Sequence, residues 1–157
     1  MDRIVVGVDG SEHSHRALRW AVEEARLRGA EVEVVHAGAK AEISAWPAVL
    51  PTPSHEDLVA AGNAVVDEVL EAVDTDGVTI TREVRPSVTA DLLCDRALDA
   101  DLLVVGARGL GGFRGLMLGS VTQHVVAHSP RPVVVVVPED RSTDESPRRR
   151  RRSAKSA

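Results

Sequence analysis

The segment from Gly106 to Pro132 constrains the fold of this 157-residue chain more than any other. Four apolar residues, 102–105, precede it and indicate a buried strand. Six of its first fourteen residues are glycine, which lets a backbone turn tightly and approach a ligand closely. Ser120 then stands where an N-cap would start a helix over Val121–Ala127. The segment is therefore expected to form a strand, a glycine-rich loop and a helix start.

Such a junction suits phosphate binding, because the free N–H groups at a helix start and the helix dipole attract anions. Arg108 and Arg114 could neutralise phosphates or could be solvated surface side chains. The spacing is not that of a P-loop, since no Gly-Lys-Ser/Thr closes it. It also departs from the dinucleotide fingerprint and comes late in the chain. A side chain at Gly109 or Gly119 is expected to block phosphate approach or to force disallowed backbone angles.

The spacing Gly-x-x-Gly, nine residues, Gly-Ser is met by Gly106, Gly109, Gly119 and Ser120. Together with the valine-rich residues that follow, it resembles the ATP-binding signature of the universal stress protein family, over residues 1–138. The resemblance implies ATP as ligand, with Mg²⁺ that arrives on the phosphates and keeps most of its waters. The candidate nucleotide contacts are Gly7, Val8, Asp9, Ala37, Val105, Gly106, Arg108, Gly109, Gly119, Ser120, Val121 and Thr122.

Strand and helix patterns alternate along the rest of the chain, which predicts an α/β fold with a mostly parallel sheet and right-handed crossovers. Helices are expected to begin at Ser11 or Ser14, at Ser54, near Thr89 and at Ser120. Leu98 is expected within the third of them, and Val126 on the same face of the fourth as Val121 and Val125. The expected strands are Ile4–Val8, Val32–His36, Val78–Val84 at a sheet edge, Leu102–Val105 and Val133–Val137.

The resemblance implies an open five-stranded sheet of order 3-2-1-4-5, Rossmann-like or flavodoxin-like, with helices on both faces. In open sheets of this kind, ligands bind outside the carboxyl ends of the strands, where the strand order reverses. Asp9 and the glycine loop would then face the same crevice. Asp9 has two interpretations: a turn or N-cap residue, or a nucleotide contact.

Composition excludes several classes of protein. The apolar residues are nearly all Val, Ala and Leu, with one Phe, two Trp and no Tyr, which suits a helix-covered parallel sheet. Few aromatic residues argue against base stacking on single-stranded nucleic acid. Cys94 is the only cysteine, so no internal disulfide can form. Its side chain is expected to be buried. The N-terminus is too polar for a signal peptide and no run is long enough to span a membrane, so a cytoplasmic location is expected.

Residues 139–157 differ from the rest of the chain and are expected to form a disordered tail. They hold seven basic and four acidic residues and therefore carry a net charge of +3. Because the whole chain has a net charge of −5, residues 1–138 carry −8. The run Arg148–Arg152 could tether the protein to nucleic acid or anionic lipid, or could simply be solvated. The acidic body itself is a poor candidate for nucleic-acid binding.

The histidines and the run at residues 7–11 are further candidates for functional roles. His36 ends a strand and is expected to be structural, and no histidine pair with carboxylates has metal-ligand spacing. The Gly-Val-Asp-Gly-Ser run at residues 7–11 is also similar to the first phosphate motif of the actin and sugar-kinase superfamily. That fold needs two large lobes, for which this chain is too short.

The resemblance implies a nucleotide-dependent regulator of stress response that acts through an unknown protein partner. The alternative is a slow ATPase or nucleotidyl-transfer enzyme, which the lack of a recognisable general base disfavours. The valine-only strand Val133–Val137 would be an aggregation hazard at an uncovered sheet edge. Because related proteins pair this strand across a two-fold axis, a homodimer is expected.

Overall fold

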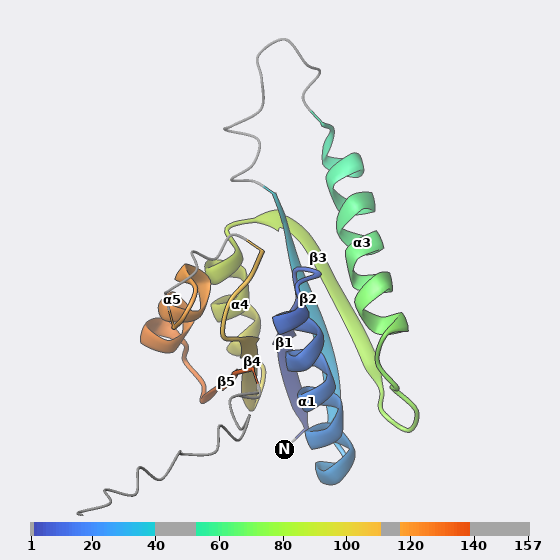
Figure 1. Ribbon diagram of the computed structural model, residues 1–157, viewed down its shortest axis with the longest axis vertical. Coiled ribbons are helices and arrows are strands. Elements are labelled where there is room, and N and C mark those ends of the chain that lie inside the picture. Colours follow the sequence, from blue (N-terminus) through green and yellow to red (C-terminus); the bar gives the residue numbers. More distant parts are fainter. Residues whose placement is uncertain (1, 40–52, 111–116, 139–157) are drawn as a thin grey trace, which may run out of the picture.

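The computed structural model describes residues 2–39, 53–110 and 117–138 and places five strands in one sheet (Figure 1). The strands lie in the order β3-β2-β1-β4-β5, and all four neighbouring pairs are parallel. Both the α/β class and the order are confirmed. The strand bounds are β1 Arg3–Gly7, β2 Glu31–Ala39, β3 Ile80–Ser87, β4 Leu102–Gly106 and β5 Val133–Val136.

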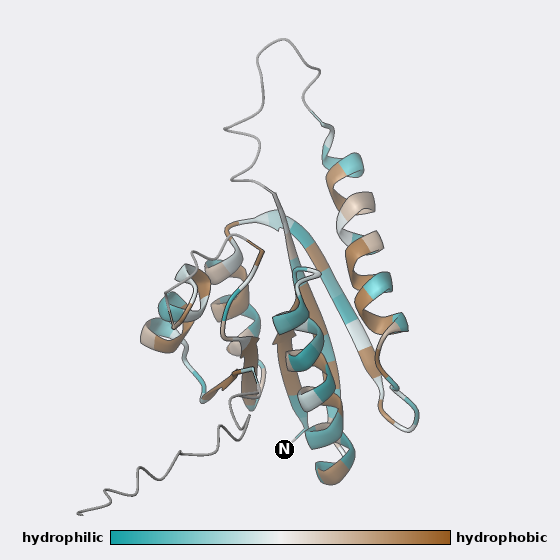
Figure 2. Ribbon diagram, in the orientation of Figure 1, coloured by the Kyte–Doolittle hydropathy of each residue, from teal (hydrophilic) through white to brown (hydrophobic). Residues whose placement is uncertain are grey.

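Within the described residues, four helices cover the two faces of the sheet: α1 Glu12–Arg28, α3 His55–Glu71, α4 Thr89–Ala97 and α5 Ser120–His128. Side chains alternate between the faces of a strand, so each strand supplies two apolar cores. One core joins Ile4, Val6 and Val34 to α1 and α3, while Val5 and Val35 pack with α4 and α5 on the opposite face. The strands are hydrophobic through the centre of the sheet, and the outward side of α1 is hydrophilic (Figure 2).

Serine side chains cap two of the helices. Ser11 starts α1 by accepting a hydrogen bond from the Ser14 N–H at 3.2 Å, which settles the choice between the two serines. Ser54 starts α3 in a capping box with Asp57, and the hydrogen bonds from Ser54 lower the pKa of the Asp57 carboxyl. α5 is different: Gly119 is its N-cap and no side chain caps it. The prediction of Ser120 as N-cap is therefore wrong, because Ser120 is the first helical residue.

Two apolar residues that the sequence assigns to helices are exposed. Leu98 is 56% exposed because α4 ends at Ala97 and Leu98 follows as its C-cap. Val126 is 52% exposed, and the buried positions of α5 are Thr122 and Val125. Thr122 takes the inward position because its hydroxyl donates to the Gly106 carbonyl at 2.8 Å, a tertiary contact that apolar periodicity does not reveal.

A buried ion pair links the sheet to α4. Glu33, only 4% exposed, projects from β2 toward the face covered by α4. Its Oε1 accepts hydrogen bonds from Arg96 Nε at 2.8 Å and Nη2 at 2.6 Å. Arg3 of β1 lies farther away, with Nη1 at 3.9 Å from Oε2. The carboxylate therefore depends mainly on Arg96 for its stabilisation.

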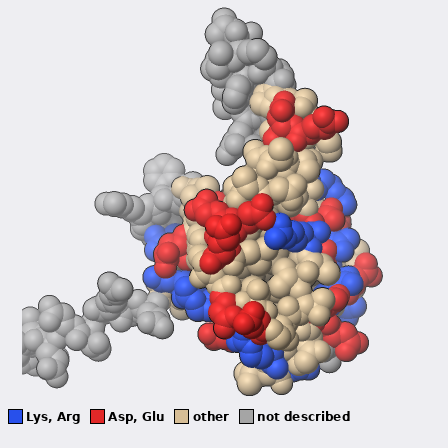
Figure 3. Space-filling model, turned by 90° about the vertical axis from the view of Figure 1, so that its right-hand side faces the viewer, with Lys and Arg blue, Asp and Glu red and all other residues tan. Residues whose placement is uncertain are grey.

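The two edge strands differ in character. β5 is all valine, whereas β3 carries charged residues along the side of the molecule that also bears α3, where acidic and basic side chains lie close together (Figure 3). Two ion pairs belong to this side: Arg82 with Asp67 of α3, and Arg85 with Glu83. β3 is confirmed as an edge strand, although it begins at Ile80 instead of Val78.

Candidate functional site

The candidate site lies at the carboxyl edge of the sheet, where β1 and β4 are neighbours. From β1 the chain continues into α1, which covers one face, and from β4 it continues toward α5 on the other face. The strand order reverses at this point, which is where ligands bind in open parallel sheets. Asp9 and the segment 106–110 meet there, as predicted.

Asp9 connects the turn after β1 to the loop after β4. Its Oδ1 accepts from the Ser11 N–H at 3.0 Å, which closes the turn into α1. Its Oδ2 accepts from the Leu110 N–H, also at 3.0 Å and from a residue 101 positions away. The turn interpretation of Asp9 is therefore correct, and the same carboxylate also positions the glycine loop.

The motif glycines differ in how tightly they are packed. A Cβ on Gly109 would lie 2.4 Å from Asp9 Oδ2, and a Cβ on Gly106 would lie 2.7 Å from the His13 carbonyl oxygen. Both positions require glycine because of this close approach. A Cβ on Gly119 would come no closer than 3.4 Å to Arg108 Cα, and its φ is −72°. Of the two effects expected of a side chain at Gly119, disallowed backbone angles are therefore excluded, and blocked phosphate approach stays a prediction.

The start of α5 presents N–H donors that have no side-chain acceptor among the described residues. The first-turn N–H groups of residues 120–122 have no intrahelical acceptor, and no side chain caps them. The Gly119 N–H donates to the Ala107 carbonyl at 2.8 Å, which holds the helix start against the loop. Ser120 is exposed at this end. The arrangement favours an anion beside the loop.

The other candidate residues lie at the same edge but on two faces of the sheet. Gly7, Ala37 and Val105 face α4 and α5, where a Cβ on Gly7 would lie 3.0 Å from the Leu93 side chain. Val121 packs against the same core. Val8 belongs to the opposite core, with its N–H donating to the Val35 carbonyl at 2.9 Å.

Three further predictions concern histidine, cysteine and arginine residues near the site. His36 Nδ1 lies 2.8 Å from the Val8 carbonyl oxygen, so this histidine has the structural role expected of it. Cys94 is partly buried against the core under α4 and α5, and burial raises the pKa of its thiol. Arg114 and the glycines at 111, 112 and 115 lie outside the described residues.

His13, in the first turn of α1, was missed by the sequence reasoning. It lies directly beneath Gly106, and its Nδ1 is buried without a hydrogen-bond partner among the described residues. Burial, followed by the charges of Arg108 and Arg16, lowers the pKa of His13. A usable signal existed, because the first turn of the helix after β1 borders the same crevice as Asp9.

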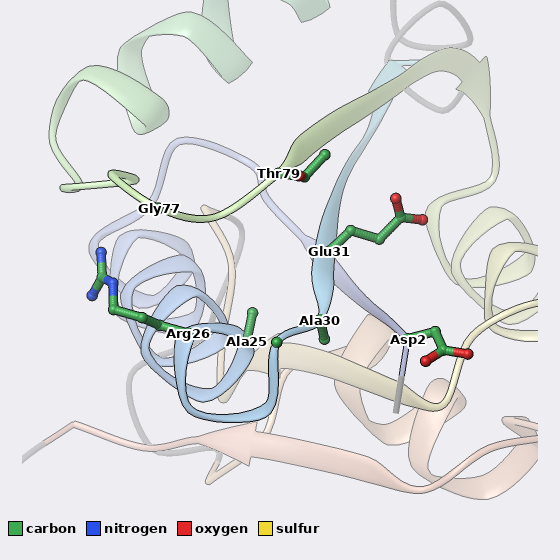
Figure 4. Close-up of a pocket in the computed structure, with 8 residues that line it drawn as sticks. Asp2, Ala25, Arg26, Ala30, Glu31, Gly77 and Thr79 are labelled. Atoms are coloured by element: carbon green, nitrogen blue, oxygen red, sulfur yellow. The ribbon is translucent and has the colours of Figure 1, made fainter.

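Two surface cavities lie at the other end of the sheet, around the starts of the strands. One, of about 500 Å³, is lined by residues including Asp2, Glu31 and Thr79 (Figure 4). The other, of about 440 Å³, includes Arg3 and Arg131. Their mixed acidic and basic lining offers no counterpart to the anion-binding geometry at the carboxyl edge.

The described ranges 2–39, 53–110 and 117–138 contain neither a metal-ligand cluster nor a membrane-spanning helix. Within them no three His, Cys, Asp or Glu side chains are grouped so that they could hold a metal ion. Within the same ranges no helix is both long and apolar enough to cross a membrane.

Comparison with known sequences gives a consistent assignment. The Universal stress protein family pattern matches residues 1–137. A universal stress protein of Mycolicibacterium smegmatis is 35% identical over 151 residues, which cover 91% of this chain and 50% of that protein. The chain thus spans about half the length of the curated relatives that it matches first.

Solved structures with the same fold include nucleotide complexes. A universal stress protein in complex with cAMP superimposes with a TM-score of 0.65 at 28% identity, covering 86% of this chain and 96% of that one. The universal stress protein from Archaeoglobus fulgidus in complex with dAMP gives a TM-score of 0.61 at 27% identity, covering 86% and 97%. The sequence match, the strand order and the switch-point site agree: the chain belongs to the universal stress protein family.

Proposed function

We propose that the protein binds ATP at the carboxyl edge of the sheet and acts in the cytoplasm as a nucleotide-dependent regulator of stress response, through protein partners. The observation that carries this proposal is the uncapped start of α5 beside a loop anchored on Asp9. The cAMP and dAMP complexes of similar proteins support a nucleotide as the ligand class.

The polar groups at this edge divide into two kinds. The N–H groups of residues 120–122, the Ser120 hydroxyl and the Arg108 guanidinium are donors, suited to phosphate oxygens. Asp9 is an acceptor and would repel phosphate, so its role is to hold the loop and to accept from hydroxyl or amino groups of the nucleoside. Gly7, Ala37 and Val105 supply an apolar wall on the α4 side of the edge.

Mg²⁺ fits this site as an ion carried by the phosphates. The described residues hold no ready-made group of three ligands, and a magnesium ion held by phosphates keeps several waters. When bound, it would neutralise phosphate charge. The protein's own contribution would be to orient the phosphates through backbone N–H donors. The glycines of the loop have no side chains and so leave room for the phosphates.

ATP binding should raise thermal stability. At 100 times its dissociation constant, ATP is expected to stabilise the folded protein by about 2.7 kcal/mol. For a domain of this size the melting temperature should rise by about 5–10 °C. The measurement is a thermal melt with and without ATP and Mg²⁺, together with identification of any nucleotide released on denaturation. No shift at millimolar ATP and no released nucleotide would contradict the proposal, and turnover of labelled ATP would favour the slow-ATPase alternative.

We also expect a homodimer that pairs β5 with β5. Every residue of this edge strand is a half-exposed valine, and covering the strand removes unpaired backbone groups from solvent. Val135→Lys should convert the dimer into a monomer, because it places a charge in the valine contact. Thr81→Lys, on the opposite edge strand, is the matched control and should leave the mass unchanged. Light scattering at micromolar concentration distinguishes the two, and a monomeric wild type would exclude the pairing.

The proposed domain boundary is residue 138. Residues 139–157, with the run Arg148–Arg152, lie outside the described part of the chain. Their disorder and their possible contact with nucleic acid or lipid therefore stay predictions.

A further inference from the structure

His13 occupies a position that links α1 to the glycine loop. A Cβ on Gly106 would lie 2.8 Å from His13 Cβ and 2.7 Å from its carbonyl oxygen, so the first motif glycine packs directly on this residue. The Gly106 carbonyl also accepts the Thr122 hydroxyl at 2.8 Å. Gly106 is therefore held between the first turn of α1 and the first turn of α5, and His13 lies next to the proposed phosphate position.

Two buried nitrogen atoms near this contact have no hydrogen-bond partner among the described residues: His13 Nδ1 and Arg108 Nε. An unpartnered buried polar atom costs free energy, and such atoms in native proteins often mark functional positions. Both belong to residues that can carry positive charge: His13 comes from the first turn of α1, and Arg108 comes from the glycine loop. The pair is therefore poised for an anion that arrives from outside the chain.

The charged groups around His13 explain its state in the free protein. Arg108 from the loop and Arg16 from α1 oppose its protonation, whereas Asp9 from the turn and Glu12 from α1 favour it. Burial is the largest effect, followed by Arg108 and Arg16, and together they hold the pKa of His13 below its ordinary value. In the ligand-free protein the surroundings of His13 thus disfavour its charged form.

Resting on the ATP binding proposed above, we propose that His13 takes up a proton when the phosphates bind beside it, so that nucleotide binding becomes tighter as the pH falls. Phosphate brings negative charge to the loop and compensates the positive charge of Arg108. Both changes favour the charged imidazole. His13 thereby adds a charged contact that exists only in the complex.

The sign of the effect follows from proton linkage. If the complex has the higher His13 pKa, binding takes up a proton at any pH near the two pKa values, and lowering the pH drives binding. Each unit by which the pKa rises in the complex increases the affinity tenfold between the alkaline and acid limits. We expect a rise of about one unit and thus an effect of about tenfold.

The direct test is a proton NMR titration of the His13 imidazole in the full chain, with and without saturating ATP and Mg²⁺. Loss of the resonance in His13→Asn assigns it among the six histidines. The expected result is a His13 pKa higher by about one unit in the complex. An unchanged or lower pKa would overturn the inference.

A second test compares the ATP affinity of wild type with that of His13→Asn between about pH 8 and about pH 5.5, either side of the ordinary histidine pKa. The ratio of the two affinities should grow several-fold in favour of wild type on acidification and should approach tenfold only below the His13 pKa of the free protein. Taking this ratio removes the titration of ATP itself. His15→Asn is the control, since His15 Nδ1 already contacts the Ser11 carbonyl at 2.9 Å, and it should follow wild type. A constant ratio overturns the inference and leaves ATP binding standing, whereas no binding at any pH overturns both.

Discussion

Replacing Gly109 with valine should abolish ATP binding and leave the fold intact. The new Cβ would lie 2.4 Å from Asp9 Oδ2, a distance that no real contact tolerates. Asp9 cannot yield cheaply, because its carboxylate holds the Ser11 and Leu110 N–H groups. The loop must therefore move off Asp9, which takes its donors away from the phosphates. Gly109 itself is exposed, so the apolar cores are unaffected.

The measurement is ATP affinity by calorimetry, with the melting temperature of the free variant as a check of folding. Gly119→Ala tests the second motif glycine. Its Cβ meets only ordinary contacts of 3.4 Å or more, and its φ of −72° suits alanine, so the backbone should keep its shape and the loss of ATP affinity should be smaller than in Gly109→Val. Wild-type affinity in Gly109→Val would show that the loop does not need Asp9.

Replacing Arg96 with alanine should cost about 2–4 kcal/mol of unfolding free energy, because it leaves Glu33 buried without its main partner. Arg96 is 28% exposed and Arg3 lies within 3.9 Å of Glu33, so the loss should stay toward the lower end of the range for buried pairs. The corresponding fall in melting temperature is about 5–15 °C. Chemical denaturation measures the free energy directly.

Two variants test the reason for this loss. Arg82→Ala breaks an exposed pair with Asp67 and should cost no more than about 1 kcal/mol. The double variant Glu33→Leu with Arg96→Met removes both charges and should recover most of the stability lost in Arg96→Ala. An Arg96→Ala variant as stable as Arg82→Ala would mean that water or Arg3 already satisfies Glu33.

Local patterns predicted the strands and most helix starts, because a buried strand and a serine cap each depend on a few neighbouring residues. Ser11 and Ser54 show this directly. The cap of α5 could not be predicted in this way. Gly119 and Ser120 are both good N-cap residues, and the choice depends on the Gly119 N–H bond to the Ala107 carbonyl, a contact across the loop.

The candidate site was located from sequence, but the contacts within it were not. Asp9 and the glycine loop were placed at one crevice, whereas the hydrogen bond from Leu110 to Asp9 depends on the folded loop. His13 touches Gly106 only because β4 lies beside β1. Glu33 is a similar case, because its partner Arg96 lies 63 residues away in the sequence.

The contrast between the two edge strands limits the size of any assembly. A chain whose two edges could both accept a strand would add copy after copy into an open filament. Here β5 offers only valine, while β3 carries Arg82, Glu83 and Arg85 and would present charge to an incoming strand. If β5 pairs with β5 as proposed above, both copies use the same surface, the charged strand β3 is the edge that remains on each sheet, and growth would stop at two chains.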